Sequence, residues 1–149
     1  MTMADWNPEQ YRKFASERAQ PFHDLLALVG PGPIRSAVDL GCGPGELTAL
    51  AARALDVERM LGRDNSPAML AAAHEHADAR VQFDERDIGS WTSAGDVDLV
   101  LASASLQWIP NHAAVLRQWI SALAPGGQIA VQVPANPDRS PFTLYCTPG

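Results

Sequence analysis

The fold of this chain is decided by the stretch VDLGCGPG at residues 38–45. The residues before it, 36–40, predict a short apolar strand, and residues 46–54, rich in Ala and Leu, predict a helix. A strand that passes through glycines into a helix N-terminus allows a ligand to approach the backbone closely. The stretch therefore predicts a ligand site at its three glycines, Gly41, Gly43 and Gly45.

The same alternation of strand and helix continues along the chain. The apolar pattern predicts further strands at 57–63, 80–84, 97–102 and 127–133, and helices at 67–77 and 112–123. Strands and helices at this spacing form right-handed βαβ units. We therefore expect an α/β, Rossmann-like fold with a mostly parallel sheet and helices on both faces.

The N-terminal region predicts helix over residues 7–29, with Asn7 as N-cap and Pro8 at the first helical position. Pro21 is expected to divide this stretch into two helices. The sequence thus predicts an N-terminal helical cap over 1–30, a cofactor-binding Rossmann-like domain over 31–135 and an irregular tail over 136–149.

Composition excludes several function classes. The 149 residues carry a net charge of −6, which disfavours nucleic acid and anionic membranes as partners. No apolar run has the length of a membrane span, and the N-terminus lacks a signal pattern, so a cytoplasmic location is expected. The two cysteines, Cys42 and Cys146, and the pair His74 and His76 lack ligand spacing, so no metal site is expected.

The charges around the glycines indicate the kind of ligand. Glu46 follows the G-x-G-x-G pattern directly, and Asp39 precedes it by two residues. Carboxylates at a helix N-terminus oppose a pyrophosphate, which disfavours a dinucleotide. They suit S-adenosylmethionine, which carries an ammonium, a sulfonium and a ribose diol but no phosphate.

Two further carboxylates follow predicted strands, where parallel sheets bind ligands. Asp64, followed by Asn65, is placed to accept both ribose hydroxyls, and Asp87 to accept from the adenine amino group. The adenine ring would lie between Ile88 and either Met69 or Trp91.

These motifs, with SPAM at 66–69 and LAPGGQIAVQV at 123–133, resemble in order the motifs of class I S-adenosylmethionine-dependent methyltransferases. DWNP at 5–8 and ASLQW at 104–108 are similar to the trans-aconitate 2-methyltransferase family, over about residues 4–136. That resemblance implies methylation of one carboxylate of trans-aconitate, a small-molecule substrate, to a monomethyl ester.

The resemblance also implies roles for individual residues. Gln107 and Trp108 would lie beside the transferred methyl group. Arg18 would pair with a substrate carboxylate, because a guanidinium matches that group, and Trp6 and Tyr11 would form a lid. The expected cofactor contacts are Asp39, Gly41, Gly43, Gly45, Asp64, Asn65, Met69, Asp87, Ile88 and Ser103.

The sequence departs from the family pattern in three places. Arg63 stands where an apolar residue is usual, and Ser103 where asparagine is expected. Family members also continue beyond this length, so we expect the final strands to be missing and the fifth strand to be a bare edge. Two alternatives stay open: a remnant that binds S-adenosylmethionine without turnover, and an NAD-dependent oxidoreductase, which the glycine spacing disfavours.

Overall fold

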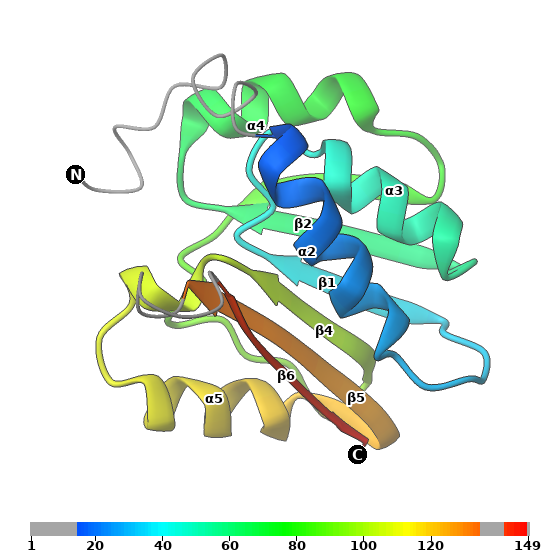
Figure 1. Ribbon diagram of the computed structural model, residues 1–149, viewed down its shortest axis with the longest axis vertical. Helices are drawn as coiled ribbons and strands as arrows, with labels where there is room; N and C mark the ends of the chain where they lie inside the picture. The colour runs from blue at the N-terminus through cyan, green and yellow to red at the C-terminus, as the bar shows by residue number, and fades with distance from the viewer. Residues whose placement is uncertain (1–14, 135–141, 149) are drawn as a thin grey trace.

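The protein is described by a computed structural model that covers residues 15–134 and 142–148, with side chains from residue 19 to residue 133. Figure 1 shows a single sheet whose strands are ordered β3-β2-β1-β4-β5-β6. The strands are β1 Ser36–Leu40, β2 Arg59–Asp64, β3 Val81–Glu85, β4 Val97–Ser103, β5 Leu123–Pro134 and β6 Phe142–Pro148. The helices are α2 Ala15–Ala27, α3 Glu46–Ala54, α4 Pro67–Ala73 and α5 His112–Ser121, with short 3-10 turns η2 His74–His76 and η3 Leu106–Trp108.

The first five strands form a parallel sheet. β1 pairs with β2 on one side and β4 on the other, β2 pairs with β3, and β4 pairs with β5. All five therefore end at the same edge of the sheet, where ligands bind in α/β folds. The α/β, Rossmann-like fold expected from the sequence is confirmed.

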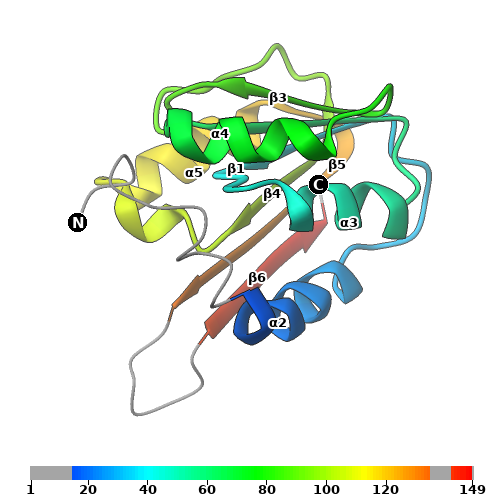
Figure 2. The same cartoon turned by 90° about the horizontal axis from the view of Figure 1, so that it is seen from above.

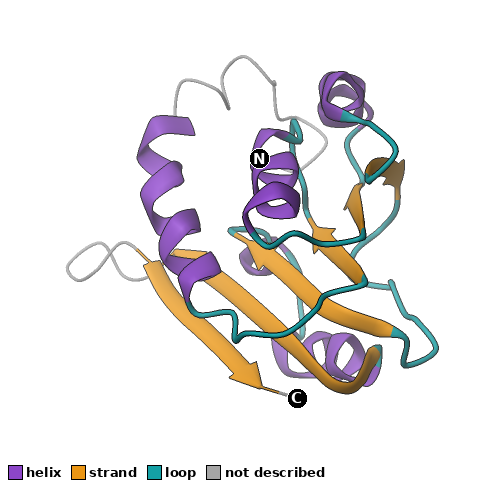
Figure 3. Ribbon diagram, turned by 90° about the vertical axis from the view of Figure 1, so that its right-hand side faces the viewer, coloured by secondary structure: helices purple, strands orange, loops and turns teal. Residues whose placement is uncertain are grey.

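Helices cover both faces of the sheet, as Figure 3 shows. One core cluster joins α2, α3 and α4 to the sheet through buried residues such as Leu25, Ala51 and Leu70. The other joins α5 and the β3–β4 connection through Trp119, Val115 and Trp91. The apolar runs of the central strands therefore meet packed side chains on both sides.

The prediction that Pro21 divides the N-terminal helix is wrong, because α2 continues through it. Phe22, Leu25 and Leu26 follow the proline and are buried against the sheet. This burial offsets the backbone hydrogen bond that proline cannot make. The described part of residues 1–30 thus shares the core of the sheet; the proposed boundary at residue 30 stays a prediction.

The expected irregular tail is also wrong for Phe142–Pro148, which form β6 antiparallel to β5 (Figure 2). β5 is therefore not a bare edge. Residues of high β propensity fill this segment, and proline is tolerated at the ends of edge strands. None of the described helices is long and apolar enough to cross a membrane.

Candidate functional site

A cavity of about 110 Å³ lies at the carboxyl edge of the parallel sheet. It is bounded by the segments that follow β1, β2, β3 and β4, which is the usual place for ligands in such sheets. The described residues that line it are Gly41, Asp64, Asn65, Asp87, Ile88, Ser105, Trp108, Ile109 and Pro110.

The glycine loop forms one wall of this cavity. Gly41, Gly43 and Gly45 all have positive φ, at 85°, 57° and 85°, a conformation that favours glycine. A Cβ on Gly41 would collide with the Cβ of Ser105, which lines the same cavity. The backbone N–H groups of Gly41 and Cys42 donate to the Arg63 carbonyl at 2.8 and 3.1 Å, so the loop is fixed to the end of β2.

Asp64 joins the cavity to the glycine loop. Its side chain is buried, with Oδ2 accepting from the Gly43 backbone N–H at 3.0 Å and Oδ1 from that of Ser66 at 2.9 Å. Burial raises the pKa of Asp64, while these N–H donors oppose the rise. Each carboxylate oxygen retains capacity to accept a further hydrogen bond, as binding of a ribose diol requires.

Asp39 lies behind the loop and is not among the described residues lining the cavity. Its side chain is buried on β1, and Thr48 Oγ1 donates to its Oδ2 at 2.6 Å. Burial raises the pKa of Asp39 to about 6, opposed by the Thr48 hydrogen bond and reinforced by the charge of Asp64. The geometry therefore links Asp39 to the start of α3.

The turn after β3 brings Asp87 and Ile88 to the cavity, and α5 holds it there. Asp87 Oδ1 accepts from the Gly89 N–H at 3.0 Å, which leaves Oδ2 available to a ligand. Trp119, fully buried on α5, donates its Nε1–H to the Ile88 carbonyl at 3.0 Å. Gln118 donates to the Trp91 carbonyl at 2.7 Å.

The segment after β4 supplies three cavity residues that the sequence did not suggest: Ser105, Ile109 and Pro110. Ser105 is buried, and its Oγ donates to the Leu40 carbonyl at 2.8 Å. This bond spans two strand ends, so only the adjacency of β1 and β4 reveals it. Residue patterns alone predicted no order of strands and so gave no signal for this contact.

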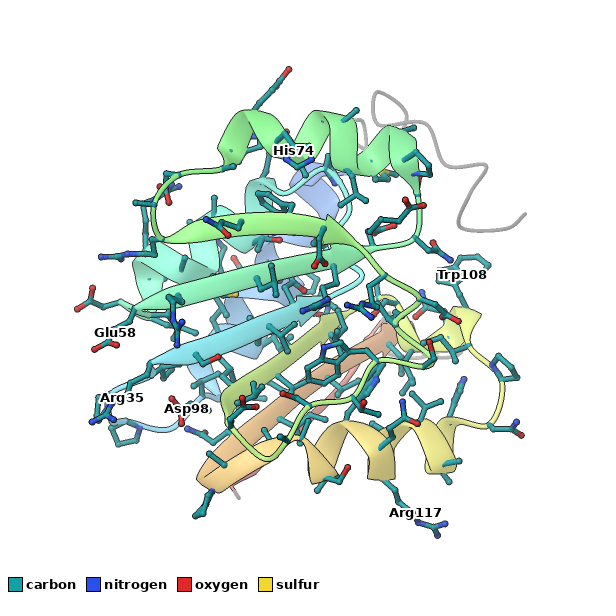
Figure 4. The ribbon with its side chains drawn as sticks, turned by 180° about the vertical axis from the view of Figure 1, so that it is seen from behind. Arg35, Glu58, His74, Asp98, Trp108 and Arg117 are labelled. Atoms are coloured by element: carbon teal, nitrogen blue, oxygen red, sulfur yellow. The ribbon has the colours of Figure 1, made fainter. Side chains whose placement is uncertain are left out.

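The two residues expected beside the methyl group follow in η3. Trp108 lines the cavity with 42% of its surface exposed, and Figure 4 shows it standing at the edge of the molecule. Gln107 is not among the described lining residues; its Nε2 donates to the Ala104 carbonyl at 2.8 Å. Its buried Oε1 has no hydrogen-bond partner, so an acceptor remains available beside the site.

Other predicted residues lie elsewhere. Met69 and Trp91 are buried and do not appear among the described lining residues. Ser103 Oγ donates to Gln132 Oε1 at 3.2 Å and is likewise outside the lining. The predictions for Trp6, Tyr11 and the side chain of Arg18 concern positions outside the described residues.

Arg63, the unusual residue before Asp64, pairs across the sheet with Asp84 of β3. Its Nη1 lies 3.1 Å from both Asp84 carboxylate oxygens, and the two residues are register partners. Burial lowers the pKa of Arg63, and the Asp84 carboxylate opposes that shift. The described atoms of Arg63 thus serve the β2–β3 pair rather than the cavity.

Comparison with known proteins agrees with this geometry. The methyltransferase domain model matches residues 37–127, which include the glycine loop, Asp64 and Asp87. The chain belongs to the methyltransferase domain family. This membership favours methyl transfer over the oxidoreductase alternative.

Individual relatives show which methyltransferases the chain is similar to. The chain is 47% identical to a trans-aconitate 2-methyltransferase of Mycobacterium sp. (strain KMS), over 89% of this chain and 51% of that protein. It spans about half the length of the curated relatives it matches. The family resemblance expected from the sequence is confirmed.

Solved structures share the fold. A putative methyltransferase of Haloferax volcanii, solved with its activator, matches 88% of this chain and 57% of its own at a TM-score of 0.77 and 22% identity. Phosphoethanolamine N-methyltransferase 2 of Haemonchus contortus, solved with S-adenosyl-L-methionine, matches 76% of this chain and 28% of its own at 0.69 and 26% identity. The fold is that of S-adenosylmethionine-binding methyltransferases.

The described cavity residues have charges and hydrogen-bonding groups that fit that cofactor. Asp64 and Asp87 contribute two carboxylates to the lining, and no described Lys or Arg joins them. Such a lining suits a ligand with cationic groups and hydroxyls, and disfavours phosphates. Among the described residues, no group of three or more His, Cys, Asp or Glu is arranged to hold a metal ion.

Proposed function

We propose that this chain transfers the methyl group of S-adenosylmethionine to a carboxylate of a small polycarboxylic acid, trans-aconitate, giving a monomethyl ester. The observation that carries the proposal is the cavity at the carboxyl edge, where the glycine loop meets Asp64 and Asp87. The identity of 47% to a trans-aconitate 2-methyltransferase supports the choice of acceptor.

The cavity assigns distinct tasks to its residues. Asp64 and Asn65 would hold the ribose hydroxyls, and Asp87 the adenine amino group. Ile88 and Ile109 would exclude water from the adenine and ribose. The close approach of Gly41 to Ser105 keeps the loop backbone at the cavity wall without a side chain between them.

S-adenosylmethionine, when bound, supplies an electrophilic methyl group on a sulfonium. An acceptor carboxylate has an ordinary pKa near 4, so it is ionised at neutral pH and needs no general base. With the donor held by Asp64, Asn65 and Asp87, the carboxylate oxygen would take the methyl group as the carbon–sulfur bond breaks and the electron pair stays on sulfur. Proximity, alignment and desolvation then account for catalysis.

Gln107 and Trp108 are proposed to position the acceptor. Trp108 lines the cavity with 42% of its surface exposed, so an entering substrate meets its ring. The orphan Oε1 of Gln107 would accept a hydrogen bond from an ordered water that in turn donates to the acceptor carboxylate.

The carboxylates of the substrate that do not react need positively charged partners, which must come from outside the described lining. That lining contains Asp64 and Asp87 and no described cation, so it repels a polyanion by itself. Arg18 is the proposed partner, with Trp6 and Tyr11 closing over the acceptor. Because the chain spans about half of its curated relatives, further cations would come from sequence that those relatives possess.

The proposal is tested by incubating the purified chain with methyl-tritiated S-adenosylmethionine and trans-aconitate. We expect labelled monomethyl ester, lower yield with cis-aconitate, and loss of turnover in Arg18→Ala. Saturable binding of S-adenosylhomocysteine with no ester from any acid would instead select the binding-only alternative. Turnover with monocarboxylates equal to that with trans-aconitate would contradict the assigned acceptor.

A further inference from the structure

Arg63 is a charged residue on β2, an inner strand of the sheet, and the cofactor contacts described above do not use it. Only 14% of its side chain is exposed, and its Nη1 lies 3.1 Å from both carboxylate oxygens of Asp84 on β3. Its Nε is buried and has no hydrogen-bond partner among the described residues. A buried polar atom without a partner requires an explanation.

The stability of the sheet does not supply that explanation. A buried N–H group without an acceptor lowers the free energy of unfolding. Apolar side chains of similar volume often replace a buried ion pair with no loss of stability. The benefit of pairing Arg63 with Asp84 therefore has to be sought in what the two strand ends carry.

The strand ends that this pair joins carry the two carboxylates of the cavity. Asp64 follows Arg63 directly, and Asp87 follows Asp84 by three residues. The Asp64 carbonyl accepts from the Arg86 N–H at 2.9 Å. One backbone hydrogen bond and one ion pair therefore fix the start of the Asp87 turn to the end of β2.

The backbone of Arg63 extends this connection to the glycine loop. Its carbonyl accepts from the N–H groups of Gly41 and Cys42 at 2.8 and 3.1 Å. Arg63 thus contacts β3 through its side chain and the glycine loop through its backbone, and both lead to walls of the cavity. Without the side-chain contact, only backbone bonds would hold the end of β3 in place.

We propose that Arg63 is a positioning residue of the cofactor site, acting through its ion pair with Asp84. The pair sets the distance between Asp64, at the ribose, and Asp87, at the adenine amino group. Both groups of an adenosine can be bound at once only when the two carboxylates stand at the matching distance. The inference rests on the proposed binding of S-adenosylmethionine at these residues, and it is independent of the acceptor and of the transfer step.

The test measures the affinity of the 149-residue chain for two ligands by calorimetry. One is S-adenosylhomocysteine, and the other is S-inosylhomocysteine, in which an oxo group replaces the adenine amino group. Arg63→Met keeps an extended side chain and removes the ion pair. We expect it to bind S-adenosylhomocysteine about tenfold more weakly than wild type. We also expect it to discriminate less between the two ligands, because Asp87 is no longer held at the amino group.

Urea unfolding separates positioning from stability. Arg63→Met should keep at least the wild-type free energy of unfolding, because Asp84 has 44% of its side chain exposed and stays solvated without its partner. Asp84→Asn weakens the same pair from its exposed end and should reduce the discrimination in the same way. Arg63→Lys keeps a cation for Asp84 and should recover part of it. Arg80→Met removes the more exposed pair with Asp56, at the start of β3, and should bind both ligands like wild type.

Unchanged discrimination between the two ligands in folded Arg63→Met or Asp84→Asn would overturn the proposal, whether or not the affinity falls. A residue that serves only stability changes both affinities equally. Failure of Arg63→Lys to recover any discrimination would also contradict it. Absence of S-adenosylhomocysteine binding by the folded wild-type chain would overturn the proposed function too, so the two failures are distinguishable.

Discussion

At the scale of single residues, the site depends on two buried carboxylates with different partners. Asp64 accepts from the loop backbone at Gly43 and also lines the cavity, so it serves both structure and binding. Asp39 is held by Thr48 and lies behind the loop. The sequence predicted both as cofactor contacts, because position beside the glycine loop or at a strand end says nothing of burial; only the packed structure separates them.

Asp39 makes stability depend on pH. Its pKa rises from 3.8 to about 6 on folding, so its stabilising contribution is full below about pH 4 and is lost as pH rises through 6. The loss is about 3 kcal/mol at neutral pH. Asp39→Asn keeps an acceptor for Thr48 and removes the ionisation. We therefore expect the unfolding free energy of the variant to increase relative to that of wild type as pH rises.

This expectation is checked by urea unfolding between about pH 4 and 8. Glu85→Gln, which alters an exposed carboxylate on β3, serves as the control and should keep the wild-type pH profile. Identical pH profiles for Asp39→Asn and wild type would refute the assignment of this pH-dependent loss of stability to Asp39.

At the scale of elements, the local sequence pattern predicted those strands and helices whose formation depends mainly on their own residues. The five parallel strands followed from short apolar runs, and α4 from Ser66 and Pro67, where Ser66 Oγ accepts from the Met69 N–H. β6 was missed because Phe142–Pro148 shows no periodic apolar pattern and forms a strand only by pairing with β5. The predicted break at Pro21 was wrong because tertiary burial of α2 outweighs the lost backbone hydrogen bond.

The glycine loop yields a test that separates backbone strain from crowding. Gly41 and Gly126 have nearly equal φ, 85° and 80°, but only Gly41 has a close neighbour, Ser105. Gly126→Ala should cost about 1–2 kcal/mol of stability from strain alone. Gly41→Ala should cost more and weaken S-adenosylhomocysteine binding, because Ser105 must leave the cavity wall. Equal losses in unfolding experiments would contradict this account.

α5 is predicted to position the Asp87–Ile88 turn. Trp119→Phe preserves most of the buried volume but leaves the Ile88 carbonyl without its donor. We expect a loss of about 1–3 kcal/mol in stability and weaker S-adenosylhomocysteine binding. Arg117→Ala, an exposed change on the same helix, should alter neither. Stability loss without any change in affinity would show that the turn does not depend on α5.

At the scale of the whole molecule, the order of strands explains how much of the site could be predicted. Gly41, Asp64, Asn65, Asp87 and Ile88 lie at the cavity because each stands at, or within three residues after, the end of a strand of the parallel sheet. Ser105, Ile109 and Pro110 reach it through the packing of β4 against β1, which no local pattern encodes. Met69 was expected beside the adenine ring and Ser103 followed from the family resemblance, and the described lining includes neither.

The central claim is that the cavity beside Asp64 binds the methyl donor, and calorimetric titration with S-adenosylhomocysteine tests it most directly. We predict saturable binding to one site on the folded chain. Asp64→Asn should bind about tenfold or more weakly, because it places a donor among the N–H groups of Gly43 and Ser66. Glu85→Gln, its register partner on β3, should bind like wild type. Absence of binding by a folded wild-type chain, or unchanged affinity in Asp64→Asn, would contradict the claim.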